Sequence, residues 1–166
     1  MINKKHTISV LVENHAGVLS RISGLFARRG FNIHSLAVGI TENPTISRIT
    51  IVAEGDDYTL EQIAKQLNKL VDVIKLRSVK NEELLSRELL LIKINCTPAQ
   101  RPELIAIAEI SEAKISDVSQ TTMTLELSAN QMRISAFEEL LKPYGIKEAA
   151  RTGVIALQKG ANSLTG

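Results

Sequence analysis

The sequence predicts an α+β protein made of two βαββαβ units in tandem. Segments of alternating apolar residues, typical of strands, and segments with apolar residues at helical spacing follow one another in this order twice along the 166 residues. A polar stretch, Lys80-Asn81-Glu82-Glu83, separates the two repeats. We therefore expect one domain at residues 1–79 and a second at residues 80–166.

The first unit carries signals for the ends of its two helices. The first helix should end at Gly30, where Phe31 can pack back on Phe26. The second should begin with a capping box formed by Thr59 and Gln62. In chain order we expect a strand at 7–12, a helix at 18–29, strands at 33–40 and 46–53, a helix over 60–70 and a strand at 71–76.

The second unit repeats the same order of elements. Its first helix should open at Pro102, because proline is favoured at the first helical position, and its second should be stopped by Pro143. In chain order we expect a strand at 88–96, a helix from 102, strands at 114–121 and 123–128, a helix at 131–142, and a last strand within 148–157 that is interrupted at Gly153.

Composition and charge narrow the class of protein. Hydrophobic residues make up 44% of the chain and aromatic residues only 3%, so the core must be aliphatic. A net charge of +2 is too small to indicate nucleic acid or an anionic membrane as partner. The single cysteine, Cys96, excludes an internal disulfide and favours a reducing cytoplasm. The N-terminal residues lead directly into an alternating strand, so we expect neither a signal peptide nor a membrane span.

The sequence offers no set of residues for catalysis. Cys96 ends an apolar strand, where a buried and inert thiol is expected. His6, His15 and His34 lack metal-ligand spacing, although His15 and His34 could approach each other, and we assign no metal site. No glycine-rich phosphate loop of Walker or Rossmann spacing is present. We therefore predict no catalytic, cofactor-binding or metal-binding residues.

RNA binding is an alternative, because βαββαβ is also the order of a common RNA-recognition fold. That fold stacks bases on exposed aromatic residues of its central strands. The corresponding strands at 7–12 and 46–53 contain none, which disfavours RNA. A sheet with helices on one face and apolar residues on the other is instead expected to bind a protein partner.

The turn between the first strand and the first helix is the strongest candidate site. Gly17 lies in the bend, and the first amides of the following helix have no partner within the helix and carry its positive dipole end. Such a turn can bind a carboxylate. Asn14 adds an amide that both donates and accepts hydrogen bonds. An ordinary structural turn is the alternative interpretation of this pattern.

Several segments of the chain resemble the regulatory (small) subunit of acetohydroxyacid synthase, also called acetolactate synthase. The similarity extends from about Ile8 to Leu157 and is most specific in the first half. The segments that carry it are Leu11–Arg21, Gly30–Ile33, Ser47–Thr50, Gln66–Val73 and Ala150–Val154.

This resemblance implies an ACT domain in the first half and a ferredoxin-like, ACT-like domain in the second. It implies a non-catalytic regulatory subunit that dimerises through the ACT domain and stimulates the catalytic large subunit. It also implies feedback inhibition by valine in branched-chain amino-acid biosynthesis, although the preferred branched-chain amino acid stays open. Thiamine diphosphate, Mg²⁺ and FAD belong to the large subunit in that family, so we assign no cofactor to this chain.

In the family, effectors bind between two ACT domains, so that one chain supplies the loop and the other supplies the start of the second strand. The site residues carried over from the family are Asn14, His15, Gly17, Val18, Leu19, Asn32 and Ile33. Many ACT domains have proline before the loop glycine, where this chain has Ala16, so we expect a less rigid loop. An ACT-type amino-acid sensor for a different enzyme is the main alternative, and an RNA-binding module a distant one.

Overall fold

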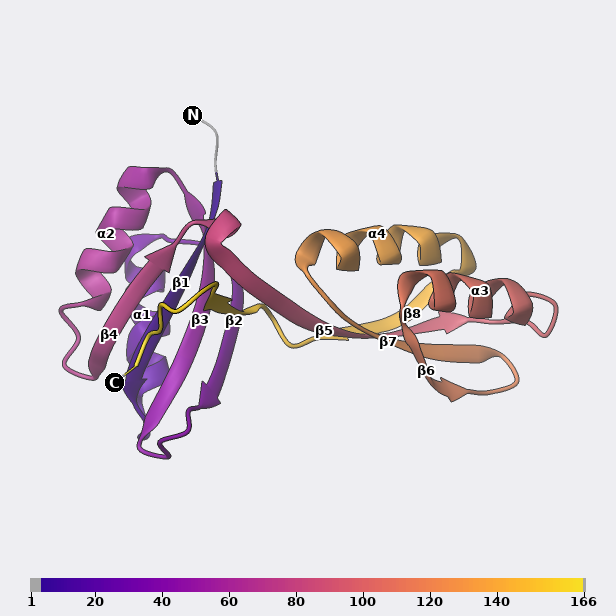
Figure 1. Ribbon diagram of the computed structural model, residues 1–166, viewed down its shortest axis with the longest axis horizontal. Helices are drawn as coiled ribbons and strands as arrows, with labels where there is room; N and C mark the ends of the chain where they lie inside the picture. Colours follow the sequence, from indigo (N-terminus) through magenta and orange to yellow (C-terminus); the bar gives the residue numbers. More distant parts are fainter. Residues whose placement is uncertain (1–3, 166) are drawn as a thin grey trace. The chain divides into compact units, whose positions relative to one another are not determined.

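The computed structural model describes residues 4–165 (Figure 1). Residues 1–3 and 166, which we had placed in the N-terminal segment and the tail, lie outside the described residues. The elements are β1 (Lys4–Glu13), α1 (Val18–Arg29), β2 (Ile33–Ile40), β3 (Ile46–Gly55), α2 (Asp57–Leu67), β4 (Val73–Val79), the 3₁₀ turn η1 (Asn81–Glu83), β5 (Leu84–Asn95), α3 (Arg101–Ser111), β6 (Lys114–Val118), β7 (Thr122–Ala129), α4 (Gln131–Leu141), the 3₁₀ turn η2 (Lys142–Tyr144), β8 (Ile146–Arg151) and β9 (Ile155–Gln158).

The first unit is an antiparallel sheet in the order β2-β3-β1-β4, with α1 and α2 packed on one face. Its core is mainly aliphatic, as the composition predicts. Alternate residues of β1 and β3 form the side of the core that belongs to the sheet. The end of α1 is also confirmed. Gly30 has a positive φ of 68°, and the Phe31 amide donates to the Phe26 carbonyl at 3.0 Å. The two rings pack edge to face with centroids 6.1 Å apart.

The second unit repeats this architecture, with the sheet order β6-β7-β5-β8. Alternate residues of β5 and β7 pack against α3 and α4, and Ile134, Phe137 and Leu141 are buried as expected. The prediction of two tandem βαββαβ units is therefore confirmed.

The C-terminal residues belong to the first unit rather than to the second. The two compact units are residues 1–85 together with 154–166, and residues 86–153. The division expected from the sequence had assigned all residues after 79 to the second domain. The difference arises because the chain after Gly153 packs with the first unit. β8 and β9 are separate strands, and β9 still pairs with β5 as the fifth strand of the second sheet.

The C-terminal segment, residues 154–165, covers the face of the first sheet that is not covered by the helices. Thr7, Ser9, Leu11, Thr50 and Val52 lie on that face and are only 2–8% exposed. The segment donates from the Val154 amide to Ser35 and accepts from Arg48, Arg77 and Lys75, side chains of β3 and β4. In Figure 1 it is the yellow trace that crosses the first sheet. The face expected to await a partner protein is thus occupied by the chain itself.

The capping box expected at the start of α2 was wrong. Asp56, not Thr59, caps α2, because its side-chain oxygen accepts from the Thr59 amide at 2.8 Å and the helix begins at Asp57. The end of α4 is confirmed, because the helix ends at Leu141 and Pro143 lies in the 3₁₀ turn η2 that follows it, where its missing N–H is tolerated near the start of the turn. Among the described residues, no helix is both long and apolar enough to span a membrane.

Candidate functional site

The turn from β1 to α1 leaves the first helix without a cap. Gly17 has φ 90° and ψ −16°, a left-handed conformation that suits glycine, and its carbonyl accepts the first helical bond from the Arg21 amide. Within the described part of the chain no side-chain hydrogen bond caps the helix, and no acidic residue lies in its first turn. The first amides of α1, including those of Val18 and Leu19, are therefore available to an anion.

Asn14 ties this turn to the hairpin between β2 and β3. Its backbone amide donates to the Thr45 carbonyl at 2.8 Å, and its side-chain Nδ2 donates to the Pro44 carbonyl at 2.8 Å. One donor of the side chain is thus engaged in holding the turn. The side-chain oxygen is the group best placed to accept a hydrogen bond from a ligand.

His15 is held by the backbone on one side of its ring and by carboxylates on the other. Its Nδ1 donates to the Ala16 carbonyl at 3.0 Å, while Nε2 lies 3.1 Å from Asp72 and 3.3 Å from Glu13. With Nδ1 protonated, a neutral ring would point the Nε2 lone pair at two carboxylates. The Ala16 carbonyl, followed by the two carboxylates, therefore raises the pKa of His15 above its ordinary value.

Asp72 joins the turn to the first helix, and we did not identify it from the sequence. Its side chain is 7% exposed and accepts from Arg21 Nη1 at 2.5 Å, and its carbonyl accepts from the Glu13 amide. The Arg21 hydrogen bond is the main cause of the lowered pKa of Asp72. Asp72 could be found only by placing the start of β4 beside the end of β1, which requires the sheet order.

Glu13, His15 and Asp72 also place three potential metal-ligand atoms within 4.8 Å of one another. His34, which the sequence allowed to approach His15, is not part of this group and lies near Glu54 instead. Arg21 and a protonated His15 balance the charges of the two carboxylates. An ion-pair network accounts for this geometry without a metal.

The structure separates the predicted site residues into two groups within one chain. Asn14 to Leu19 lie at one end of the sheet, where Glu13 pairs with Ile46. Asn32 and Ile33 lie at the other end, where Ile33 pairs with Ala53, seven residues further along β3. At about 3.3 Å per residue, the two groups are about 23 Å apart along the strand. One chain therefore does not bring them together.

The individual side chains of these residues have different environments. Val18 is buried in the first core, so only its backbone amide faces the turn, whereas Leu19 is 44% exposed. Asn32 is exposed and Ile33 is partly buried. Outside this site, Cys96 is buried as predicted.

Comparison with known proteins identifies the family. Residues 8–75 match the family described as AHAS small subunit-like ACT domain, and residues 87–160 match the small subunit of acetolactate synthase. A protein of Archaeoglobus fulgidus named "Probable acetolactate synthase small subunit" is 50% identical over 94% of this chain and 98% of its own length. The chain belongs to the acetolactate synthase small-subunit family.

Other members of this family support the same assignment. The acetolactate synthase small subunit of Mycolicibacterium smegmatis is 46% identical over 96% of this chain and 94% of its own length. The crystal structure of the small subunit from Thermotoga maritima superposes with a TM-score of 0.89 at 39% identity, over 96% of this chain and 99% of that one. The resemblance noted in the sequence, and the ACT-type fold it implied, are thereby confirmed.

Proposed function

We propose that this protein is the regulatory subunit of acetolactate synthase, which binds the catalytic subunit in the cytoplasm, stimulates it and makes it sensitive to valine. The names of the family's members support the partnership with a catalytic subunit. The site contributes an uncapped helix start and a side-chain amide, which suit an amino acid better than a reacting substrate. The cofactors of the reaction are then held by the catalytic subunit.

The observation that carries the proposal is the separation of the two groups of site residues along β3. An effector that touches both groups must lie between two copies of the chain. β2 is an edge strand, and its Val38 and Ile40 side chains are 48% and 69% exposed. Antiparallel pairing of β2 with its own copy across a two-fold axis places the Ile33 end of one chain beside the Ile40 end of the other. The Ile40 end is the end that carries Asn14.

Valine has a group for each part of such a shared site. Its carboxylate accepts from the first amides of α1, at the positive end of the helix. Its ammonium donates to the Asn14 oxygen of one chain and the Asn32 oxygen of the other. Its branched side chain contacts Leu19, which is half exposed, and Ile33.

Binding inhibits only if valine prefers one arrangement of the dimer or of the complex with the catalytic subunit. Hydrogen bonds to charged groups contribute about 1.5–3 kcal/mol each, enough to shift such an equilibrium substantially. Because each of the two equivalent sites lies across the interface between the chains, a change in the angle between the chains alters the distance between the two halves of each site. A valine-dependent dimer geometry is therefore the simplest means of control.

Reconstitution with the catalytic subunit tests this function. The catalytic subunit alone should make acetolactate slowly and without response to valine. Addition of this protein should raise the rate and introduce inhibition by valine, whereas this protein alone, supplied with all cofactors, should make no acetolactate. Turnover by the isolated protein contradicts the regulatory role. Stimulation with no response to any branched-chain amino acid contradicts the proposed effector and favours an ACT-type sensor of another amino acid.

A further inference from the structure

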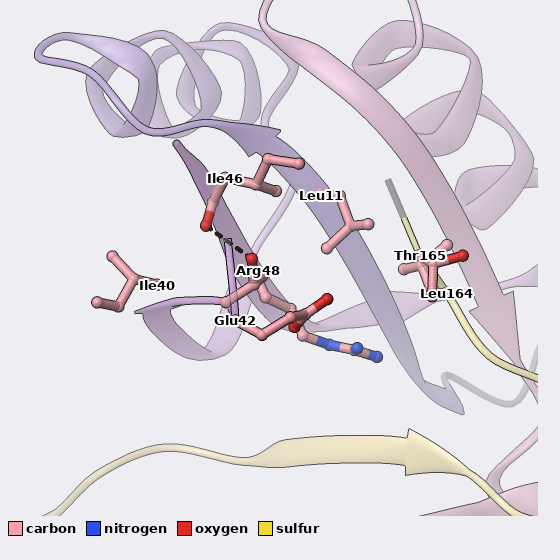
Figure 2. Close-up of a pocket in the computed structure, with 8 residues that line it drawn as sticks. Leu11, Ile40, Glu42, Ile46, Arg48, Leu164 and Thr165 are labelled. Carbon is pink, nitrogen blue, oxygen red and sulfur yellow. Dashed lines mark hydrogen bonds between the residues drawn. The ribbon is translucent and has the colours of Figure 1, made fainter. Parts of the chain in front are cut away.

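A second candidate site lies on the other face of the first sheet. A cavity of about 140 Å³ opens there between β1, the hairpin that joins β2 to β3, and the C-terminal segment (Figure 2). All of its walls belong to the first unit. Its main lining residues are Leu11, Ile40, Glu42, Ile46, Arg48 and Leu164.

Arg48 is the unusual residue of this cavity. Its side chain is partly buried, and its Nη2 donates to the Ala156 carbonyl at 3.2 Å. Its Nε is buried and has no hydrogen-bond partner among the residues described. None of the ion pairs found within residues 4–165 involves Arg48. A partly buried guanidinium without a close carboxylate can still pair with an anion, and here Glu42 acts on it only from beyond ion-pair distance.

The charge environment favours a ligand with both signs of charge. Burial, together with the neighbouring Arg77, lowers the pKa of Arg48, while Glu42 opposes this shift. Glu42 is exposed, and Figure 2 shows it projecting beside Arg48. A ligand carboxylate bound at Arg48 would therefore lie near the Glu42 carboxylate. This favours a ligand that also carries a cationic group.

We propose that this cavity binds a small aliphatic α-amino acid within a single chain. The ligand's carboxylate pairs with the Arg48 guanidinium, and its ammonium faces Glu42. Its aliphatic side chain contacts Leu11, Ile46 and Leu164, which supply the apolar walls. An enclosed cavity of roughly 150 Å³ holds a benzene molecule, so a volume of this size suits roughly six to eight non-hydrogen atoms.

This site is distinct from the shared site proposed above. It lies on the sheet face opposite α1, because Leu11 and Arg48 pair across β1 and β3 on the side away from the helical core. It needs no second copy of the chain. The two sites nevertheless contact one hairpin, since Asn14 bonds to the Pro44 and Thr45 carbonyls next to Glu42.

The test is a titration of the full chain carrying Gly17→Asp, which removes the anion-binding helix start and leaves this cavity intact. Methyl groups of leucine and isoleucine are observed by NMR while L-valine or 3-methyl-2-oxobutanoate is added to about 10 mM. We expect saturable shifts at Leu11, Ile46 and Leu164 with L-valine. The oxo acid, which shares the carboxylate and the branched chain but lacks the ammonium, should bind at least ten-fold more weakly.

Three variants in the same background locate the binding. Arg48→Gln should weaken valine at least ten-fold, and Glu42→Gln should weaken valine but leave the oxo acid unchanged. Leu164→Trp fills the cavity without altering either charge and should abolish the shifts, which covers the case in which Arg48→Gln does not fold.

Saturable shifts confined to these methyl groups and lost in the variants support the proposal. The absence of saturable shifts at the cavity methyl groups overturns it, as does unchanged affinity in Leu164→Trp. Equal binding of valine and the oxo acid overturns the assignment of an amino acid. Failure of the shared site would appear separately, as the absence of valine-dependent shifts at the α1 amides of the wild-type chain.

Discussion

The two units have the same strand order but differ at the turn that leads into their first helix. In the first unit, the turn ends at Gly17 with a positive φ, and the first turn of α1 contains no carboxylate. In the second unit, Gln100 takes the position before α3 with a right-handed backbone, Pro102 removes one amide donor, and Glu103 places a carboxylate in the first turn.

Side chains also fill the turn of the second unit. The Gln100 side-chain oxygen accepts from the backbone amide and the hydroxyl of Thr97, both at 3.0 Å. The Glu103 carboxylate neighbours Tyr144 of η2, and together with burial, the larger cause, it raises the pKa of that phenol. The start of α3 therefore already has an anion of its own. The fold thus supplies the helix end in both units, while the turn residues decide whether a ligand can use it.

The largest expected effect comes from placing a carboxylate at the start of α1, as Glu103 does at the start of α3. Gly17→Asp should abolish inhibition by valine and leave stimulation largely intact, because the new carboxylate occupies the positive helix end and repels the carboxylate of the effector. The measurement is the rate of the reconstituted enzyme against valine concentration.

Two variants control for this substitution. Gly17→Asn imposes similar backbone strain without charge and should retain more of the response. Glu103→Gln, which removes the carboxylate from the second turn, should leave the valine response unchanged. A Gly17→Asp protein inhibited at the ordinary valine concentration would place the effector elsewhere.

The C-terminal segment packs with the first unit, although its β9 also pairs with β5, so removing it should destabilise chiefly the first unit. Deletion of residues 154–166 should destabilise the first unit by about 2–4 kcal/mol, because the buried Val154 and Ala156 side chains and the hydrogen bonds from Arg48 and Arg77 are lost. Hydrogen exchange followed residue by residue measures both units in one sample. Amides of residues 86–153 serve as the internal control, and equal loss of protection in both units would contradict this division of the chain.

A smaller effect is expected from the side chain that links the first turn to its hairpin. Asn14→Ala should weaken valine about ten- to hundred-fold, because it removes both a ligand acceptor and the bond to the Pro44 carbonyl. Calorimetric titration measures the affinity. Thr97→Ala in the corresponding turn of the second unit is the matched control and should leave it unchanged.

The ion-pair network of the first turn should make the stability of the first unit depend on pH. The pKa of His15 is raised by folding, so its contribution is complete below about pH 6.5 and is lost as the pH rises through the higher folded-state pKa. The pKa of Asp72 is lowered, so its contribution is present above about pH 4 and is lost as the pH falls through the lower folded-state pKa. Glu13 and Arg21 are the other charged groups of this network.

Urea unfolding at several pH values measures this dependence. The difference in the free energy of unfolding between wild type and His15→Gln should decrease as the pH rises above about 6.5. His6→Gln, in β1 and outside this network, is the control. A difference that stays constant from about pH 5 to 8 would show that His15 does not titrate with folding.

Periodicity in the sequence was sufficient for the order of strands and helices along the chain, the helix faces and the Phe26–Phe31 helix end, because these depend on neighbours a few residues apart. It could not reveal Asp72, whose contacts with His15 and Arg21 require β4 to lie beside β1. Nor could it reveal the partners of Arg48 and Arg77. In the sequence these arginines resemble solvated charges, and their partners belong to the distant C-terminal segment. Contacts between residues far apart in the chain were the part that sequence patterns did not contain.

The central claim is that valine binds between two copies of the chain, and mixing two variants tests it most directly. If Asn14 comes from one chain and Asn32 from the other, an Asn14→Ala chain paired with an Asn32→Ala chain forms one site with both lesions and one with neither. Co-refolding equal amounts should make about half the dimers mixed and restore about a quarter of the sites to wild-type affinity. Calorimetric titration of the mixture, with subunit exchange verified separately, should therefore reveal a class of tight sites that neither parent has. Only the weakened binding of the two parents would contradict the shared site.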